Sequence, residues 1–134
     1  MAVSILIFIA ILVFIILTHE LGHFTAAKLS GVKVEEFGIG FPPRLFAKKR
    51  GETDYSINLI PLGGFVRVAG EEDPSEPRGI AGKSRWTRLL FLCAGSIVNI
   101  LTPLVLLTIA FIIPTQVVTG GDVQVYEVVS GSPA

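Results

Sequence analysis

The sequence predicts a membrane protein with two transmembrane helices joined by a small β-region, and three observations support this fold class. First, the mean hydropathy of the 134 residues is +0.68 and only 16% of them are charged, against about 25% in soluble domains. Second, apolar segments at residues 2–27 and 89–113 are each long enough for a bilayer crossing, which takes about 20 residues. Third, all 11 Lys and Arg residues lie between these segments, from Lys28 to Arg88.

The distribution of basic residues predicts the orientation in the membrane. Cytoplasmic loops collect Lys and Arg, so we expect residues 28–88 to be cytoplasmic and both termini to be extracytoplasmic. The formal net charge of +0 gives no reason to expect nucleic-acid binding. A signal peptide is an alternative for the first segment, but no basic residue precedes it and no small-residue cleavage site separates it from the polar residues at its end.

The first segment, residues 1–27, carries His19, Glu20 and His23 near its end, and its helix is expected to stop near Ser30-Gly31, where glycine is a normal C-terminal stop. Two histidines four residues apart share one face of a helix, so both imidazoles can bind one metal ion. The glutamate beside the first histidine can act as general base toward a water at that metal. Chance is the alternative explanation of so short a motif, but ionisable groups inside a membrane segment are costly and need a reason. We therefore predict a Zn²⁺ site with catalytic Glu20.

The connecting residues 28–88 are expected to contain a membrane-associated β-hairpin. Apolar and polar residues alternate over residues 32–39, 55–60 and 65–68, which is typical of short antiparallel strands. Pro61 and the adjacent glycines are expected to break these strands into pieces. Gly38 and Gly40 flank Ile39 and are candidates for shaping a substrate-binding backbone near the metal, with a plain β-turn as the alternative.

The second segment, residues 89–113, contains small and polar residues that suit contact between helices. Small residues in both segments, such as Gly22 in the first, allow another backbone to approach closely. Asn99 has two readings, which stay open: it binds a strand-like substrate, or it bonds to a neighbouring helix. Cys93 is expected to be a small buried residue. The remaining residues, 114–134, are expected to be extracytoplasmic.

Several motifs occur in an order that resembles the site-2 protease family of intramembrane zinc metalloproteases. The resemblance is strongest to the bacterial branch that includes the regulator-of-sigma-E protease, and it covers essentially the whole chain. The motifs are Thr18-His19-Glu20-Leu21-Gly22-His23-Phe24, Phe37-Gly38-Ile39-Gly40-Phe41, Ile60-Pro61-Leu62-Gly63-Gly64-Phe65-Val66 and Ala94-Gly95 through Asn99.

This resemblance implies a multi-pass enzyme of the bacterial inner (plasma) membrane that hydrolyses a peptide bond in a transmembrane helix. Its partners would be the lipid bilayer and a membrane protein already trimmed by another protease, such as an anti-sigma factor remnant or a signal-peptide remnant. The resemblance also implies that residues 32–68 help to present the substrate. Residues 123–134 resemble the start of a PDZ domain.

The chain departs from the family pattern at two points. Ser96 stands where the family commonly has proline. The family's third metal ligand, an aspartate in an Asn-Pro-Asp-Gly type motif, has no match here, although a catalytic zinc site needs three protein ligands. We therefore expect the chain to be the N-terminal portion of such an enzyme. The alternative is a non-catalytic membrane module that binds transmembrane helices. A soluble zinc hydrolase is excluded by the two apolar segments.

Overall fold

The computed structural model describes residues 1–113 and residue 130, and its first element is the helix α1, Ala2–Leu29. The run from Ala2 to Leu17 is apolar except for Ser4, and in an apolar environment a helix satisfies the backbone groups of such a segment internally. It ends where the sequence predicts: Ser30 is the C-cap and its N–H bonds to the carbonyl of Ala26. Gly31 follows with a φ of +67°, a left-handed conformation that glycine adopts without a steric penalty.

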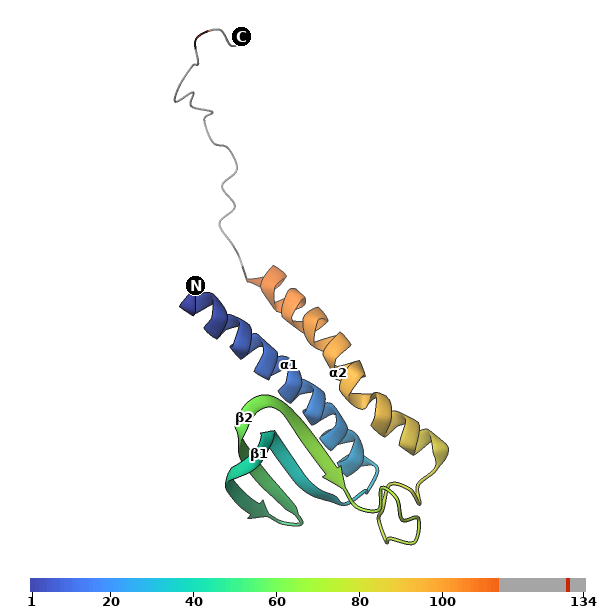
Figure 1. Cartoon of the computed structure of the whole chain (residues 1–134). Helices are drawn as coiled ribbons and strands as arrows, with labels where there is room; N and C mark the ends of the chain where they lie inside the picture. The colour runs from blue at the N-terminus through green and yellow to red at the C-terminus, as the bar shows by residue number, and fades with distance from the viewer. Residues whose placement is uncertain (114–129, 131–134) are drawn as a thin grey trace.

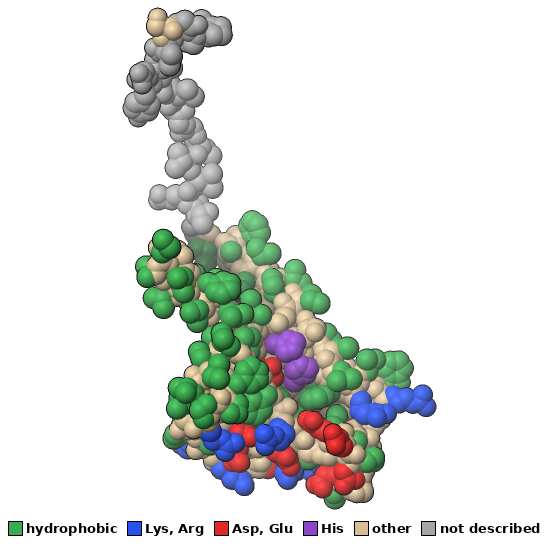
Figure 2. All heavy atoms as spheres, viewed as in Figure 1, with side chains coloured by type: hydrophobic (Ala, Val, Ile, Leu, Met, Phe, Trp, Pro, Cys, Tyr) green, Lys and Arg blue, Asp and Glu red, His purple; other side chains and the backbone are tan. Residues whose placement is uncertain are grey.

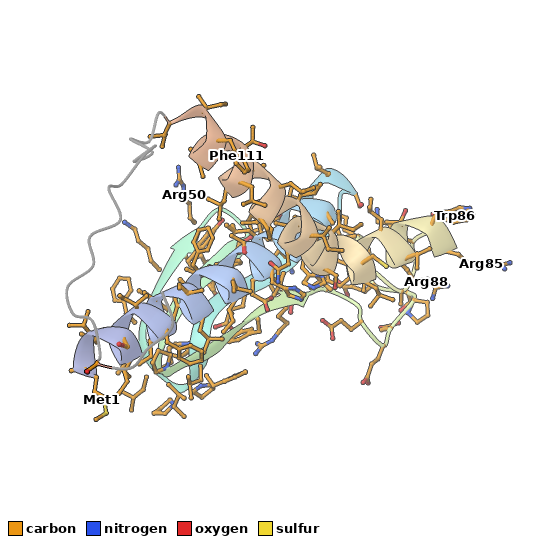
Figure 3. All side chains as sticks on the ribbon, turned by 90° about the horizontal axis from the view of Figure 1, so that it is seen from above. Met1, Arg50, Arg85, Trp86, Arg88 and Phe111 are labelled. Atoms are coloured by element: carbon orange, nitrogen blue, oxygen red, sulfur yellow. The ribbon has the colours of Figure 1, made fainter. Side chains whose placement is uncertain are left out.

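The second helix, α2, covers Arg85–Ile112 and has a side-chain cap. The Ser84 hydroxyl accepts a hydrogen bond from the backbone N–H of Thr87 at 3.2 Å, which satisfies one free donor of the first turn. The helix therefore begins one turn before the apolar segment predicted at residues 89–113, and this first turn carries basic residues. Arg85, Trp86 and Arg88 lie in this turn, far from Met1 at the start of α1 (Figure 3). The membrane boundary within α2 stays a prediction.

Between the helices, the strands β1 (Val34–Arg50) and β2 (Thr53–Val68) form an antiparallel two-stranded sheet. The predicted hairpin is confirmed, but the prediction of short separate strands is wrong. The expected interruptions occur as shifts in register, among them one between the pairs Ile39–Ile57 and Phe41–Ile60. Within the described strands, residues 61–63 have no partner across the ladder, which accommodates Pro61 without the loss of a ladder hydrogen bond.

The sheet folds back on itself, so the first half of β1 has partners in both halves of β2. Phe37 is opposite Val66 as well as Tyr55, and Gly38 is opposite Phe65 as well as Ser56. A sheet of this kind brings its residues 64–68 close to the end of α1. The result is a compact β-layer rather than a single extended ribbon.

The helix α1 is the central element, with α2 packed against one side and the sheet against the other (Figure 1). A small core lies where the end of α1 meets the sheet and the connection to α2. Its buried members are Ala27, Val32, Val34, Val68 and Ile80, with Phe24, Val66 and Phe91 packed against them. This core fixes the position of the β-layer relative to the last turns of α1.

The outer surface of both helices is apolar and exposed, and each helix is long and apolar enough to cross a membrane. Figure 2 shows hydrophobic side chains over the helices and charged side chains gathered at the end of the molecule that carries the connecting residues. An apolar surface of this size is costly in water and suits lipid. Cys93, expected to be buried, is instead exposed on α2. The predicted PDZ-like start at residues 114–134 lies outside the described residues, apart from residue 130.

Candidate metal centre

The helix α1 places His19 and His23 on one face, as their spacing of four residues predicts. Their Nε2 atoms are 3.2 Å apart, and their rings meet edge to face with centroids separated by 4.8 Å. Two nitrogens bound to one tetrahedral zinc at 2.0–2.1 Å are about 3.3–3.4 Å apart. The two imidazoles therefore already have almost the separation that two ligands of one zinc ion have.

The helix α2 supplies hydrogen-bond partners for the other nitrogen of each ring. Nδ1 of His23 is 2.7 Å from the backbone carbonyl of Phe91. Because a carbonyl can only accept, Nδ1 carries the hydrogen, and Nε2 of the neutral ring is free to bind a metal. Nδ1 of His19 is 3.4 Å from Nδ2 of Asn99, whose Oδ1 accepts a hydrogen bond from the Thr18 hydroxyl at 3.1 Å.

The two helices come this close because glycines lie at their crossing. A Cβ on Gly22 would stand 2.6 Å from the carbonyl oxygen of Ala94, so the close approach predicted for Gly22 is confirmed. A Cβ on Gly95 would stand 2.5 Å from Nε2 of His23 and 2.6 Å from Nε2 of His19. Any side chain at position 95 would therefore compete with both nitrogens for the space beside them.

Glu20 faces the β-layer rather than α2. A Cβ on Gly64 of β2 would stand 2.8 Å from Cγ of Glu20, 3.5 Å from Cγ2 of Ile16 and 3.2 Å from the carbonyl oxygen of Gly38. The backbone at Gly64 thus lies directly against the glutamate. His19 and His23 face one neighbouring element and Glu20 faces the other, so the motif lies between α2 and the sheet.

The predicted substrate-binding glycines lie in the part of β1 that packs near Glu20. Gly38 is in the ladder opposite Phe65, whose ring fills the space where a side chain would stand. Gly40 has a φ of +80° and a backbone close to the carbonyl of Ile60. A side chain would be strained there, so this glycine is required by its conformation. A role of either glycine in substrate binding stays a prediction.

The two histidines fit a zinc ion as two of its ligands. Neutral imidazole nitrogens are ordinary zinc ligands, and Gly95 leaves space beside both of them. Within residues 1–113, no group of three or more His, Cys, Asp or Glu side chains could hold a metal ion. The described residues therefore supply two ligands of the predicted site and no third.

Three contributors to the centre were not assigned a role from the sequence. The carbonyl of Phe91 left no sequence signal, because every residue has a backbone carbonyl. Gly64 and Gly95 were visible as small residues in motifs. Their position against Glu20 and against the imidazoles became clear only from the packing of the elements. The two histidines of the chain lie near the border between the apolar and the charged parts of the surface (Figure 2).

Comparison with known proteins finds a family model and several relatives that match the chain. The family model described as Peptidase family M50 matches residues 7–131. A protein of Clostridium acetobutylicum named "Putative zinc metalloprotease" is 50% identical over 104 residues, covering 75% of this chain and 31% of that protein. The zinc metalloprotease RasP of Geobacillus kaustophilus is 51% identical over 69 residues, covering 52% of this chain and 16% of that protein.

A further relative, a "Putative zinc metalloprotease" of Thermotoga maritima, is 39% identical over 133 residues, covering 95% of this chain and 26% of that protein. The chain spans less than a third of the length of these relatives. The family match extends over most of the chain and includes the helix with His19 and His23. The chain therefore belongs to peptidase family M50, the site-2 protease family that its motifs resemble.

Proposed function

We propose that the chain forms part of a zinc endopeptidase that hydrolyses a peptide bond in a transmembrane helix. One observation carries this proposal: two imidazole Nε2 atoms lie 3.2 Å apart on one face of a 28-residue apolar helix. Polar groups in such a helix are costly unless they have a function. Membership of a family of metalloproteases supports the same conclusion.

His19 and His23 would hold the zinc through Nε2, and Glu20 would act as the general base. When bound, zinc supplies a Lewis acid that polarises the scissile carbonyl and makes water more acidic. Glu20 accepts a proton from the water whose oxygen attacks the carbonyl carbon. It then delivers a proton to the amine nitrogen as the C–N bond breaks. The backbone at Gly64 confines the Glu20 side chain on the side away from the helix axis.

Within residues 1–113, no third donor joins the two histidines. The third ligand of the proposed site would therefore come from outside these residues. A carboxylate is the ligand that the family resemblance implies. It would also compensate part of the charge of the dication in a low-dielectric environment. The chain by itself is therefore expected to bind zinc weakly and to lack activity.

The depth of the site in the bilayer follows from the length of α1. At about 1.5 Å per residue, His19 lies about 25 Å from the start of the helix, whereas the hydrocarbon core is about 30 Å thick. The site would thus be near the membrane face on which the sheet lies. Water could reach it from that side without crossing the whole core.

The β-layer is the proposed docking element for the substrate. Its outer part exposes large apolar side chains, including Phe41, Leu45, Phe46, Leu59 and Leu62, which supports an association with the lipid bilayer. A substrate helix would unwind beside the backbone of Gly38 and Gly40. Asn99 keeps its two readings, a substrate contact or a bond to the neighbouring helix, and its amide is turned toward α1.

The substrate is proposed to be a membrane protein that another protease has already trimmed, such as an anti-sigma factor remnant or a signal-peptide remnant. The proposed location is the bacterial inner membrane, with residues 28–88 on the cytoplasmic side. The apolar surface of two membrane-length helices supports a membrane location.

The test uses the full-length gene product purified in detergent, with a model transmembrane substrate and a measurement of bound zinc. Glu20→Gln should retain zinc but lose cleavage, because the base is lost and both imidazoles remain. His23→Ala should lose zinc and cleavage together. Leu21→Ala is a matched control on the same helix, because Leu21 is exposed and should leave both properties unchanged.

Cleavage by Glu20→Gln at a rate near that of the wild type would show that the assigned role is wrong. If wild-type protein binds the substrate helix but neither binds zinc nor cleaves, the alternative of a non-catalytic helix-binding module holds instead. Stoichiometric zinc and turnover with residues 1–134 alone would show that the third ligand lies within this chain.

A further inference from the structure

The contacts of Asn99 point to a role in the metal centre itself, beyond the roles of His19, Glu20 and His23. The side chain is half-buried and lies between Thr18 and His19 of the neighbouring helix. It touches Nδ1 of His19, on the side of the ring opposite to the proposed metal-binding Nε2. A group in this position decides which nitrogen of a neutral imidazole carries the hydrogen.

The hydrogen bonds around the two histidines are consistent with one assignment of donors and acceptors. Phe91 requires the hydrogen of His23 on Nδ1, so Nε2 of His23 can only accept. At 3.2 Å, Nε2 of His19 must then be the donor. Nδ1 of His19 is consequently an acceptor and faces Nδ2 of Asn99, a donor. A hydrogen on Nε2 of His19, as in this order, would exclude that nitrogen as a metal ligand.

Metal binding requires the opposite order at His19. Both Nε2 atoms must be free, so the hydrogen of His19 must be on Nδ1, where it needs an acceptor. A rotation of the Asn99 amide by 180° provides one, because Oδ1 then replaces Nδ2 beside the ring. The change of tautomer that accompanies this rotation leaves the net charge unchanged, since the hydrogen of His19 only moves from Nε2 to Nδ1.

Thr18 is placed to accept both orientations of this amide. In the order above, its hydroxyl donates to Oδ1 of Asn99 at 3.1 Å. After rotation, the amide Nδ2 would donate to the hydroxyl oxygen. The hydroxyl hydrogen then has a ready acceptor in the carbonyl of Ile15, at 2.9 Å. Thr18, the Asn99 amide and Nδ1 of His19 therefore each keep a hydrogen-bond partner in either orientation.

We propose that Asn99 is a positioning residue whose amide, with Oδ1 turned toward Nδ1 of His19, holds this ring in the tautomer that binds the metal. Thr18 is the partner that makes both orientations of the amide acceptable. The proposal rests on zinc binding by His19 and His23. It assigns Asn99 an effect on metal affinity that exists without any substrate, which a residue that only contacts substrate would not have.

The experiment measures the zinc dissociation constant of the full-length gene product in detergent, by competition with a chromophoric chelator and without substrate. Asn99→Leu keeps the approximate shape but removes the acceptor, and should weaken zinc binding about 10–100-fold, the usual effect of losing such a partner. Asn99→Asp supplies an acceptor in every orientation, so it should restore affinity to at least that of the wild type. Thr18→Val should weaken binding less than Asn99→Leu, and Thr18→Ser should restore it.

Thr102→Val is the matched control. Thr102 lies on the same helix one turn away, and its hydroxyl donates to the Val98 carbonyl of its own helix, at 2.8 Å. This variant should bind zinc as the wild type does. If the Asn99→Leu and Thr102→Val variants have the same affinity, or if Asn99→Asp binds as weakly as Asn99→Leu, the proposal is wrong.

The kinetic constants separate the positioning role from direct substrate contact. At saturating zinc, Asn99→Leu should recover most of its kcat with little change in KM. An unchanged zinc affinity with a raised KM would instead make Asn99 a substrate contact and overturn the proposal. The histidine variants distinguish this failure from that of the proposed function. If His19→Ala and His23→Ala also leave zinc binding unchanged, the zinc site itself is misplaced.

Discussion

At the scale of single residues, the metal centre depends as much on a missing side chain as on the histidines. Gly95 lies where α2 passes the two imidazoles, and a Cβ there would be 2.5–2.6 Å from both Nε2 atoms. These distances are far below ordinary van der Waals contact. The neighbours are ring nitrogens held by their own hydrogen bonds to Phe91 and Asn99, so they cannot move away freely.

Gly95→Ala is therefore expected to displace at least one imidazole and to weaken zinc binding by roughly 10–100-fold or more. Chelator competition with the full-length gene product measures the effect. Ser96→Ala is the control, since Ser96 is the next residue of the same helix and is exposed. Wild-type zinc affinity in Gly95→Ala would contradict the geometry described for this crossing.

At the scale of the elements, the β-layer is held together by a buried carboxylate. Glu36 of β1 is only 4% exposed, and it accepts hydrogen bonds from Arg44 and from the Ser56 hydroxyl, the latter at 2.7 Å. Arg67 of β2 lies 3.3 Å from its other oxygen. One side chain thus connects both halves of β1 with both halves of β2, at the place where the register changes.

We expect Glu36→Gln to destabilise the β-layer by about 1–3 kcal/mol, because charge-assisted hydrogen bonds to a buried group are lost. Hydrogen exchange of the strand amides in detergent measures this loss. The adjacent Glu35 is a matched control: its side chain is 44% exposed and lies 3.7 Å from Lys33. Glu35→Gln should change stability by no more than about 0.5 kcal/mol. Equal effects of the two substitutions would rule out the role given to Glu36.

At the scale of the whole molecule, an ion cluster joins three segments that are distant in the sequence. Glu52, in the turn between the strands, bonds to Lys28 at the end of α1 at 2.8 Å and to Arg78 in the connection to α2 at 2.7 Å. The hydrogen bond from Arg78, followed by that from Lys28, lowers the pKa of Glu52 from 4.5 to about 2. The ion pairs of this cluster therefore connect the β-layer and the connecting loop to the last turn of α1.

A lowered pKa in the folded state means that the ionised form of Glu52 favours folding. This contribution is fully present above pH 4.5 and is lost as the pH falls toward about 2. Thermal unfolding in detergent should show the wild type to be more stable than Glu52→Gln at pH 7, with the difference shrinking between these two pH values. A difference that is the same at pH 7 and at pH 2.5 would exclude this contribution. Arg78→Gln should raise the pKa of Glu52, because the largest cause of the shift is removed.

The orientation in the membrane is a prediction about the whole molecule as well. All basic residues lie in residues 28–88, so this part is expected on the cytoplasmic side. In a Cys93→Ala background, single cysteines at Lys49 and Gly121 should show opposite accessibility to an impermeant reagent in intact cells. Labelling of the cysteine at position 49 from outside would show that the proposed topology is wrong.

The features that depend on local order along the chain could be predicted from the sequence. The apolar runs predicted two long helices, and the Ser30-Gly31 pair predicted where α1 ends. The spacing of His19 and His23 predicted that their rings share one face, which the 3.2 Å separation confirms. These features follow from the rise and periodicity of a helix, so they are properties of a single segment.

The surroundings of the histidines and the pairing of the strands depend instead on how the elements pack together. The Phe91 carbonyl reaches His23 because the glycines let the helices approach, and a backbone carbonyl carries no signal in a sequence. Continuous strands with a shifting register form because the ladder can tolerate unpaired residues around Pro61. The same packing turns Glu20 toward Gly64 and Asn99 toward His19. Each of these contacts joins segments that are distant along the chain, and their free energy depends on packing that no local pattern contains.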